Sequence, residues 1–220
     1  MIFHLITTQP QIYDSFLKTG LIARGIDKKI IDIKIHNLHD FAFDKHKSVD
    51  DTPYGGGAGM VLHVDVMENA LSRIKSKKTK TILLTPQGCK FGQKDAKRFA
   101  KEKNLILIAG RFEGYDERIR NLVDEEISIG DYVLTSGDLP TMILIDAISR
   151  QIPGFIEKPE SLETESFDDN LLEFPQYTKP LEFHGKKVPK ILLSGHHQKI
   201  AEWRRKESIK RTKKRRPDLF

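Results

Sequence analysis

The sequence predicts an α/β fold with a parallel sheet, followed by a small and mostly helical module. Two short apolar segments, TILLT (81–85) and NLILIAG (104–110), do not alternate with polar residues, which is typical of strands buried on both faces of a sheet. Helical segments precede and separate them, in the order of a β-α-β unit. Residues 186–220 are much more basic than the rest of the chain and predict a separate module.

The N-terminal third supplies two strands, two helices and a long loop. Residues 2–6 (IFHLI) predict a first strand, and residues 30–35 (IIDIKI) predict a second. Between them, residues 10–24 have apolar side chains at near-helical spacing before a glycine that can stop a helix. Residues 39–59 are a long polar loop, and loops of this length in compact domains are usually functional. Residues 64–75 place their apolar side chains on one helix face.

The remaining segments complete the sheet and define the module boundary. Residues 92–102 predict a polar helix between the two buried strands. Residues 127–140 (ISIGDYVLTSGDLP) have too many glycines for a helix and are too polar for a buried strand; Pro140 can start the apolar helix that follows. Residues 157–170 are acidic, lack apolar anchors and predict a mobile linker before a helix near 196–209. We therefore expect a first domain over residues 1–156, a linker over 157–172 and a basic helical domain over 173–220.

Composition excludes several kinds of protein and site. The single cysteine, Cys89, excludes an intrachain disulfide and a cysteine-based zinc cluster. No segment approaches the ~18 consecutive apolar residues of a membrane span, so we expect no membrane partner. The N-terminus lacks the basic segment and apolar core of a signal peptide, so we expect a cytoplasmic protein. Neither the P-loop motif nor the dinucleotide-binding glycine motif is present.

The positive charge is concentrated at one end of the chain. Residues 186–220 carry 13 Lys and Arg against three acidic residues, a local net charge of +10, whereas residues 1–185 have a net charge of −4. This asymmetry predicts a polyanionic partner bound by one part of the protein. The alternative is a solubilising tail, but Trp203 and Ile209 resemble the apolar side of a folded helix.

Three glycine-containing loops follow predicted strands: 85–88, 109–119 and 127–140. In a parallel sheet, ligands bind outside the carboxyl ends of the strands, where such loops meet. Main chain that lies bare beside apolar side chains suits a flat, partly polar ligand such as an adenosine. The alternative for residues 127–140 is an ordinary loop between a strand and a helix.

Motifs spread over the whole chain match one known family in the same order. They are PYGGGAGM (53–60), TPQG (85–88), GRFEG (110–114), IGDYVL (129–134), SRQIPG (149–154), LLEFPQYTKP (171–180), LLSGHHQKIAEWRRK (192–206) and RTKKRRPDLF (211–220). From Phe3 to its C-terminus, the chain resembles the bacterial tRNA (guanine-N1)-methyltransferases.

The resemblance implies a fold and an activity. It implies a trefoil-knotted methyltransferase domain that binds S-adenosylmethionine, and a homodimer with a shared active site. The implied product is 1-methylguanosine at the guanosine 3′ to the anticodon of tRNA (position 37), which supports reading-frame maintenance. The family also implies Mg²⁺, but the sequence has no ligand cluster that identifies a metal site. A non-catalytic RNA-binding protein of the same fold, and a knotted relative acting on ribosomal RNA or on a ribose 2′-hydroxyl, are the alternatives.

The resemblance places the cofactor on the three loops, with backbone groups bonded to the adenine edge. Carboxylates such as Glu113 and Asp131 would attract the sulfonium charge; alternatively, Asp131 caps a turn and Tyr132 is a packed core aromatic. The predicted cofactor-binding residues are Thr85, Pro86, Gln87, Gly88, Gly110, Glu113, Gly114, Ile129, Gly130, Asp131, Tyr132, Val133, Leu134, Gly137 and Pro140.

Methylation at guanine N1 needs a base for the N1 proton and a cation for the charge that grows on O6. By resemblance Arg150 is the cation; alternatively it caps the carbonyls of its helix. Glu165 stands where the family has the aspartate base. The two carboxyl types have similar pKa values, ~3.9 and ~4.3, but the extra methylene changes reach. Asp168 or Asp169 is the rival base, and a solvated linker residue is the alternative for Glu165.

The resemblance and the charge pattern together predict an RNA surface. Lys179 stands where the family has arginine, which weakens any two-pronged contact there. His196 and His197 are adjacent, but two histidines alone make a weak metal site, so we predict no metal ligand. The predicted tRNA-binding residues are Gly55, Gly57, Gly59, Lys179, His197, Arg204, Arg205 and Lys210.

Overall fold

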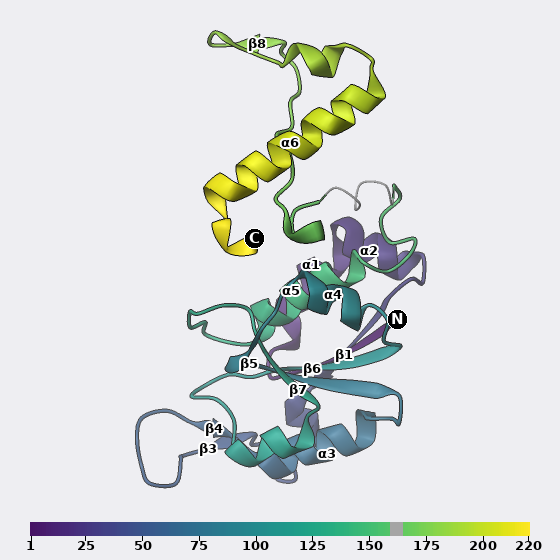
Figure 1. Cartoon of the computed structure of the whole chain (residues 1–220). Coiled ribbons are helices and arrows are strands. Elements are labelled where there is room, and N and C mark those ends of the chain that lie inside the picture. Colours follow the sequence, from purple (N-terminus) through teal and green to yellow (C-terminus); the bar gives the residue numbers. More distant parts are fainter. Residues whose placement is uncertain (159–164) are drawn as a thin grey trace. The chain divides into compact units, whose positions relative to one another are not determined.

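The computed structural model describes residues 1–158 and 165–220, and the chain divides into two compact units. The first unit is Met1–Glu157 and the second is Lys158–Phe220. Figure 1 shows their elements, and each unit is described here by itself. Residues 159–164 of the predicted linker lie outside the described residues.

The first unit is built on a five-stranded parallel sheet in the order β2-β1-β6-β5-β7. Its strands are β1 (Ile2–Thr7), β2 (Asp32–Asn37), β5 (Thr79–Lys90), β6 (Asn104–Ala109) and β7 (Glu125–Ser128). The three strands β1, β6 and β5 are central, which explains why β6 and the first half of β5 contain continuous apolar segments. This sheet confirms the predicted α/β class.

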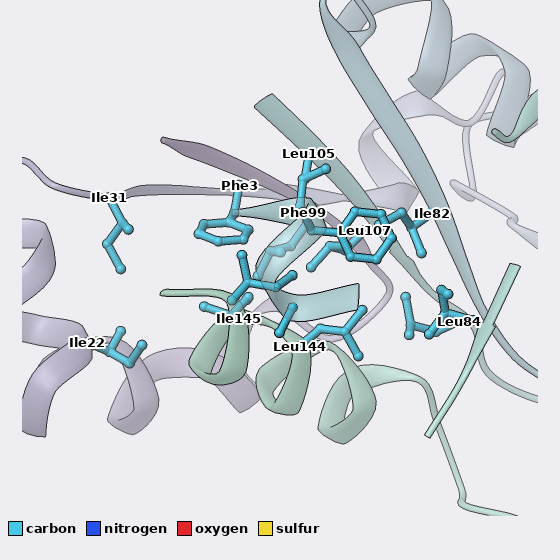
Figure 2. Close-up of a cluster of buried hydrophobic side chains, with 14 of the residues drawn as sticks. Phe3, Ile22, Ile31, Ile82, Leu84, Phe99, Leu105, Leu107, Leu144 and Ile145 are labelled. Atoms are coloured by element: carbon cyan, nitrogen blue, oxygen red, sulfur yellow. The ribbon is translucent and has the colours of Figure 1, made fainter. Parts of the chain in front are cut away.

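Helices cover both faces of the sheet, as Figure 1 shows. One face carries α1 (Asp14–Lys18), α2 (Gly20–Asp27), α4 (Gln93–Phe99) and α5 (Asp138–Ser149), and the other carries α3 (Val64–Ile74). Successive side chains of a strand point to opposite faces. Leu105 and Leu107 therefore join the cluster under α4 and α5 in Figure 2, while Ile106 and Ile108 join the cluster under α3.

Short elements fill the connections of the first unit. Two-residue strands pair antiparallel on either side of the glycine loop, and single turns of 3-10 helix follow several strands. They are η1 (Pro10–Tyr13), η2 (Leu38–Phe41), β3 (Asp50–Asp51), β4 (Val61–Leu62) and η3 (Glu117–Leu122).

The structure corrects three details of the predicted elements. The helix predicted over 10–24 is broken, because Thr19 is extended (φ −129°) and Gly20 has a φ of +63°. Helix α5 begins at Asp138, before Pro140, and a proline in a first turn removes no internal hydrogen bond. Strand β7 is not predicted by the sequence, since it is short, polar and at the edge of the sheet.

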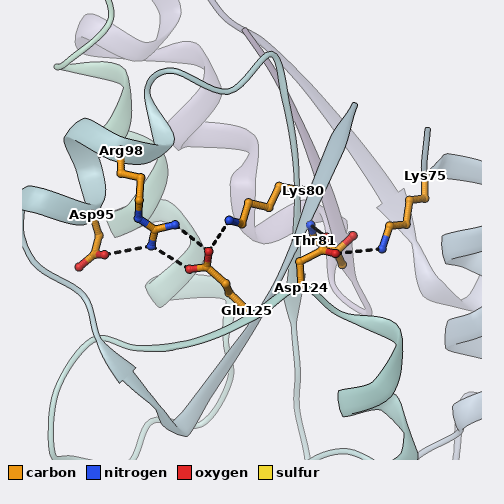
Figure 3. Close-up of polar contacts among 7 residues, drawn as sticks. All are labelled: Lys75, Lys80, Thr81, Asp95, Arg98, Asp124 and Glu125. Atoms are coloured by element: carbon orange, nitrogen blue, oxygen red, sulfur yellow. Dashed lines mark hydrogen bonds and ion pairs between the residues drawn. The ribbon is translucent and has the colours of Figure 1, made fainter. Parts of the chain in front are cut away.

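Polar side chains fasten this edge strand to α4 and β5 (Figure 3). Arg98 of α4 donates two hydrogen bonds to Glu125 of β7, of 2.6 and 2.8 Å, and Lys80 of β5 pairs with the same carboxylate. Just before β7, Asp124 accepts a hydrogen bond of 2.7 Å from the backbone N–H of Thr81. These contacts compensate for the small apolar content of β7, whose one apolar residue is Ile127.

The second unit is mostly helical. Its elements are η5 (Asp168–Asn170), β8 (Glu182–Phe183), β9 (Lys186–Lys187), η6 (Lys190–Leu193), α6 (His197–Arg215) and η7 (Pro217–Leu219). Leu171 and Phe174 are buried, and the backbone N–H of Leu172 donates to Thr212 Oγ1 of α6 at 2.9 Å. Residues after Asn170 are thus held against α6; mobility of the predicted linker stays a prediction. No helix in the described part of the chain is long and apolar enough to cross a bilayer.

Candidate cofactor and RNA site

A hollow of about 220 Å³ lies in the first unit at the carboxyl ends of β6 and β7, beside residues 84–86 in the middle of β5 and next to the start of α5. Apolar side chains and bare main chain form its wall, as the loop pattern predicts. Twelve of the fifteen predicted cofactor-binding residues line it: Thr85, Pro86, Gly110, Glu113, Gly114, Ile129, Gly130, Tyr132, Val133, Leu134, Gly137 and Pro140.

Two glycines let the loops of this hollow approach each other closely. The backbone N–H of Gly137 donates to the carbonyl of Gly110 at 2.7 Å. A Cβ on Gly137 would lie 2.9 Å from the backbone of Ala109, and a Cβ on Gly110 would lie 2.1 Å from the ring of Tyr115. No larger residue fits at either position without moving main chain or a buried aromatic ring.

The segment Ile129–Leu134 forms an open rim. Gly130 has a φ of +151°, and the ring of Tyr132 lies against its Cα. Tyr132 is 55% exposed and Val133 84% exposed, so Tyr132 is not the buried core aromatic of the alternative interpretation. Apolar groups this exposed on a rim need a ligand or another surface to cover them.

Three predicted cofactor residues lie outside the hollow. The Gln87 side chain accepts a hydrogen bond from Arg120, and Gly88 lies against the backbone of Ile127. The Asp131 carboxylate is 2.5 Å from Lys90 Nζ on the exposed side of the loop. Asp131 is therefore engaged elsewhere, and Glu113 is the predicted carboxylate that the structure puts in the wall.

The glycine loop of residues 53–60 packs against Glu113, one of the wall residues of the hollow. The backbone N–H of Glu113 donates to the carbonyl of Met60 at 3.0 Å, and a Cβ on Gly59 would lie 2.2 Å from the Glu113 side chain. Gly55, Gly57 and Gly59 have φ angles of +89°, +127° and +88°, which favour glycine. The loop therefore contacts the hollow through Glu113, and its role in binding RNA stays a prediction.

The comparisons agree with this architecture. The whole chain, residues 1–220, matches a family model described as tRNA (Guanine-1)-methyltransferase TrmD. The chain therefore belongs to the tRNA (guanine-1)-methyltransferase family. A protein of Clostridioides difficile (strain 630) named "tRNA (guanine-N(1)-)-methyltransferase" is 49% identical, with 100% of this chain and 97% of that protein aligned. One of the same name from Citrifermentans bemidjiense is 48% identical, with 100% and 90% aligned.

The two predicted catalytic residues of this family member lie in different units. Arg150 follows α5 as its C-terminal cap, half-buried, with its backbone N–H donating to the Asp146 carbonyl at 3.1 Å. Glu165 is half-buried in the second unit. Next to it, Ser166 Oγ accepts a hydrogen bond from the backbone N–H of Glu173 at 3.0 Å, so the segment around Glu165 has a defined local structure.

One rival base is occupied by a contact within the second unit. Asp169 has a φ of +49° and lies 3.4 Å from Arg205 Nη1 of α6. An aspartate in this conformation with an arginine partner is typical of a turn former. The structure thus gives Asp169 a local structural role.

The predicted RNA-binding side chains of the second unit are all exposed. They are Lys179, His197, Arg204, Arg205 and Lys210. Arg204 stacks over the ring of Phe174 at 4.7 Å, and Lys210 Nζ is 4.0 Å from Glu207. Within the described ranges, no group of three or more His, Cys, Asp or Glu side chains is placed to hold a metal ion.

Sequence reasoning missed a buried support beneath the site. Asp138, the first residue of α5, is 1% exposed and accepts hydrogen bonds from Thr7 Oγ1 (2.7 Å) and Tyr13 OH (2.8 Å). Burial and then the Asp138 carboxylate raise the pKa of Tyr13 above its ordinary value. The only sequence signal for Asp138 was its place next to Gly137 in the segment 127–140. Its partners Thr7 and Tyr13 are 131 and 125 residues away, so no local pattern indicates them. Further wall residues outside the predicted set are Leu84, Arg111, Phe112, Tyr115, Ile127, Ser128, Thr135 and Ser136.

Proposed function

We propose that this protein methylates N1 of the guanosine 3′ to the anticodon of tRNA (position 37), with S-adenosylmethionine as donor, and so supports reading-frame maintenance. The observation that carries the proposal is the close main-chain contact of Gly110 with Gly137, which forms the wall of a nucleoside-sized site in a member of this family.

The wall offers what an adenosine needs. Backbone N–H and C=O groups at Ile129–Leu134 present hydrogen-bond partners to a purine edge, and apolar side chains flank its faces. The hollow of about 220 Å³ is smaller than the ~300 Å³ at the lower end of ligand pockets, so a bound donor also contacts the open rim. Glu113 in the wall favours a positively charged sulfonium.

S-adenosylmethionine, when bound, supplies a methyl group attached to a sulfonium. The chain's own task is to make guanine N1 nucleophilic. The Glu165 carboxylate accepts the N1 proton, and the Arg150 guanidinium donates hydrogen bonds to O6 as negative charge grows there. No step is assigned to Mg²⁺, because no ligand group for it is found in the described residues.

An exposed apolar face on α5 supports the homodimer that the resemblance implies. Leu139 is 51% exposed and Ile143, one turn further along the helix, is 47% exposed. Leu134 of the rim is 38% exposed. Side chains four residues apart lie on one helix face, and a contiguous apolar face on a monomer marks an interface. We propose that a second copy of this chain covers this face.

The C-terminal unit supplies the electrostatic grip on tRNA. Nine of the thirteen residues from Arg204 to Arg216 are basic. Such a cluster neutralises phosphates and makes RNA affinity fall as salt rises. Phosphate contacts orient the RNA, whereas contacts to the base itself select the target guanosine.

The test is methyl transfer to an unmodified tRNA transcript with guanosine at position 37. Digestion should release 1-methylguanosine, and a transcript with adenosine at that position should release none. Binding of both transcripts without a methylated product would favour the non-catalytic RNA-binding protein. A methyl group on a ribose 2′-oxygen would contradict the proposed reaction.

A further inference from the structure

A second hollow, of about 470 Å³, opens at the amino ends of β5 and β6, whereas the cofactor site lies toward the carboxyl ends of the strands. Two loops form it, one between α3 and β5 and the other between α4 and β6. Five lysines and two acidic residues line it, a local net charge of +3. They are Lys77, Lys78, Lys80, Lys101, Lys103, Glu102 and Asp124, which we call the lysine hollow.

Neighbouring acidic side chains compensate only some of the positive charge around the lysine hollow. Figure 3 shows Lys80 paired with Glu125, and Lys75 Nζ 3.5 Å from Asp124. The other four lysines, 77, 78, 101 and 103, are exposed and form no ion pair within residues 1–158 and 165–220. The unit as a whole carries 22 basic and 21 acidic residues over 1–157, so this concentration is local.

A structural role in helix capping does not account for three of the four lysines. Helix α3 ends at Ile74 and α4 ends at Phe99, and the favourable effect of a cation falls off within the last turn of a helix. Lys77, Lys78 and Lys103 all lie beyond that reach. Like charges gathered on one small surface repel each other and destabilise the free protein, so an anionic ligand explains their position better than stability does.

The shape and place of the lysine hollow indicate which anion it fits. It is wide and open, and lysines act on phosphate as point charges, so it suits a run of phosphates along a chain. The six residues of β6 separate it from the cofactor site by roughly 20 Å. If the anticodon loop of an RNA lies at the cofactor site, only another part of its backbone can contact the lysine hollow.

We propose that the lysine hollow binds the phosphodiester backbone of tRNA outside the anticodon stem-loop. The inference rests on the proposed function, since it assumes tRNA as the substrate. It adds to the C-terminal helix a second and separate basic contact surface, on the methyltransferase unit.

The test compares Lys101→Gln/Lys103→Gln with wild type, using whole tRNA and a minimal anticodon stem-loop over a series of salt concentrations. Whole-tRNA affinity should fall about tenfold, and its log–log salt slope should lose roughly one for each phosphate contact removed. Stem-loop affinity and melting temperature should stay at wild-type values. Lys101→Arg/Lys103→Arg should bind like wild type. Lys18→Gln/Lys45→Gln, which removes the same charge from exposed lysines elsewhere in the unit, should change neither affinity nor slope.

Unchanged affinity and salt slope for whole tRNA would overturn the inference, as would equal losses for both RNAs. Inorganic tripolyphosphate serves as a third arm: if it protects the wild-type lysines from chemical acetylation while tRNA does not, the hollow is a small-anion site and the inference is wrong. Failure of the proposed function looks different, because the wild-type protein would then yield no 1-methylguanosine.

Discussion

The main chain of Gly137 lies directly against that of Gly110, joined by a hydrogen bond of 2.7 Å from the Gly137 N–H to the Gly110 carbonyl. The two residues stand at the end of β6 and at the start of α5, far apart in the sequence. Their contact closes the wall of the cofactor hollow. Because the partner atoms are backbone, they have little freedom to move away from a new side chain.

Gly137→Ala should therefore weaken cofactor binding. The new Cβ would lie 2.9 Å from the backbone of Ala109 and Gly110, so one of the two loops must shift. We expect at least tenfold weaker binding of S-adenosylhomocysteine in calorimetry, since a shift of about 1 Å in a positioned site costs ~100-fold. The matched control is Gly92→Ala, whose Cβ would be 3.9 Å from its nearest neighbour, the Asp95 side chain. Wild-type affinity in Gly137→Ala would contradict the assigned site.

Removal of the Glu165 carboxylate should lower single-turnover methyl transfer by about 100-fold or more, because general-base catalysis contributes ~10²–10⁴. Cofactor affinity should be retained. Asp169→Asn should lower the rate much less, since Asp169 is paired with Arg205 in the described structure. If Asp169→Asn abolishes transfer and Glu165→Gln does not, the base has been assigned to the wrong residue.

Asp138→Ala should destabilise the first unit by about 2–4 kcal/mol, because the buried hydroxyls of Thr7 and Tyr13 lose their acceptor. Asp138→Asn keeps an acceptor oxygen and should cost about 1 kcal/mol. Urea unfolding measures both. A change within ~0.5 kcal/mol for the alanine variant would mean that the hydroxyls find other partners.

The sequence predicted the parts of this fold that depend on local pattern. Strand β6 was found because both of its faces are buried and its apolar residues run on without interruption, and β1 was found because apolar residues flank its one internal polar residue, His4. Strand β7 was missed, because its glutamates are satisfied by Arg98 and Lys80 from other elements, which no local window contains. The break at Thr19 and Gly20 was missed for a similar reason, since the apolar spacing continues across it.

In the candidate site, too, the features set by local sequence pattern were predicted and those set by contacts between distant residues were not. Residues in glycine motifs that follow strands, such as Gly110, line the hollow, and their contact with the cofactor stays a prediction. Gln87 and Asp131 belong to the same motifs, but Arg120 and Lys90 hold their side chains outside it. The contact of Asp138 with Thr7 spans 131 residues, so spacing alone gives no sign of it.

Acid should weaken the fold partly through Glu125. Hydrogen bonds from Arg98, followed by that from Lys80, lower the pKa of Glu125 below its ordinary value. A carboxyl group with a lowered pKa adds stability that is fully present above its ordinary pKa of ~4.3 and is lost as pH falls through the lowered value. The pair is partly exposed, so we expect only about 0.5–1 kcal/mol. Urea unfolding at pH 6 and at pH 3 should show this loss in wild type and not in Glu125→Gln. The control is Glu68→Gln, which changes an exposed glutamate of α3 and should show the same loss of stability at pH 3 as wild type.

The proposed homodimer makes a prediction that separates a shared site from a site within one chain. Arg150→Ala and Glu165→Gln should each be inactive alone. If each site combines Arg150 of one protomer with Glu165 of the other, a mixed dimer contains one intact site and one that lacks both residues. Equal mixing followed by subunit exchange should then restore about a quarter of the wild-type sites in a single-turnover burst. The double variant Arg150→Ala/Glu165→Gln mixed with wild type is the control: its mixed dimers contain no intact site, so exchange should lower the burst from about half of the wild-type sites to about the quarter held by wild-type homodimers. Absence of any restored burst, in mixtures shown by mass spectrometry to contain mixed dimers, would place both residues in the site of a single chain.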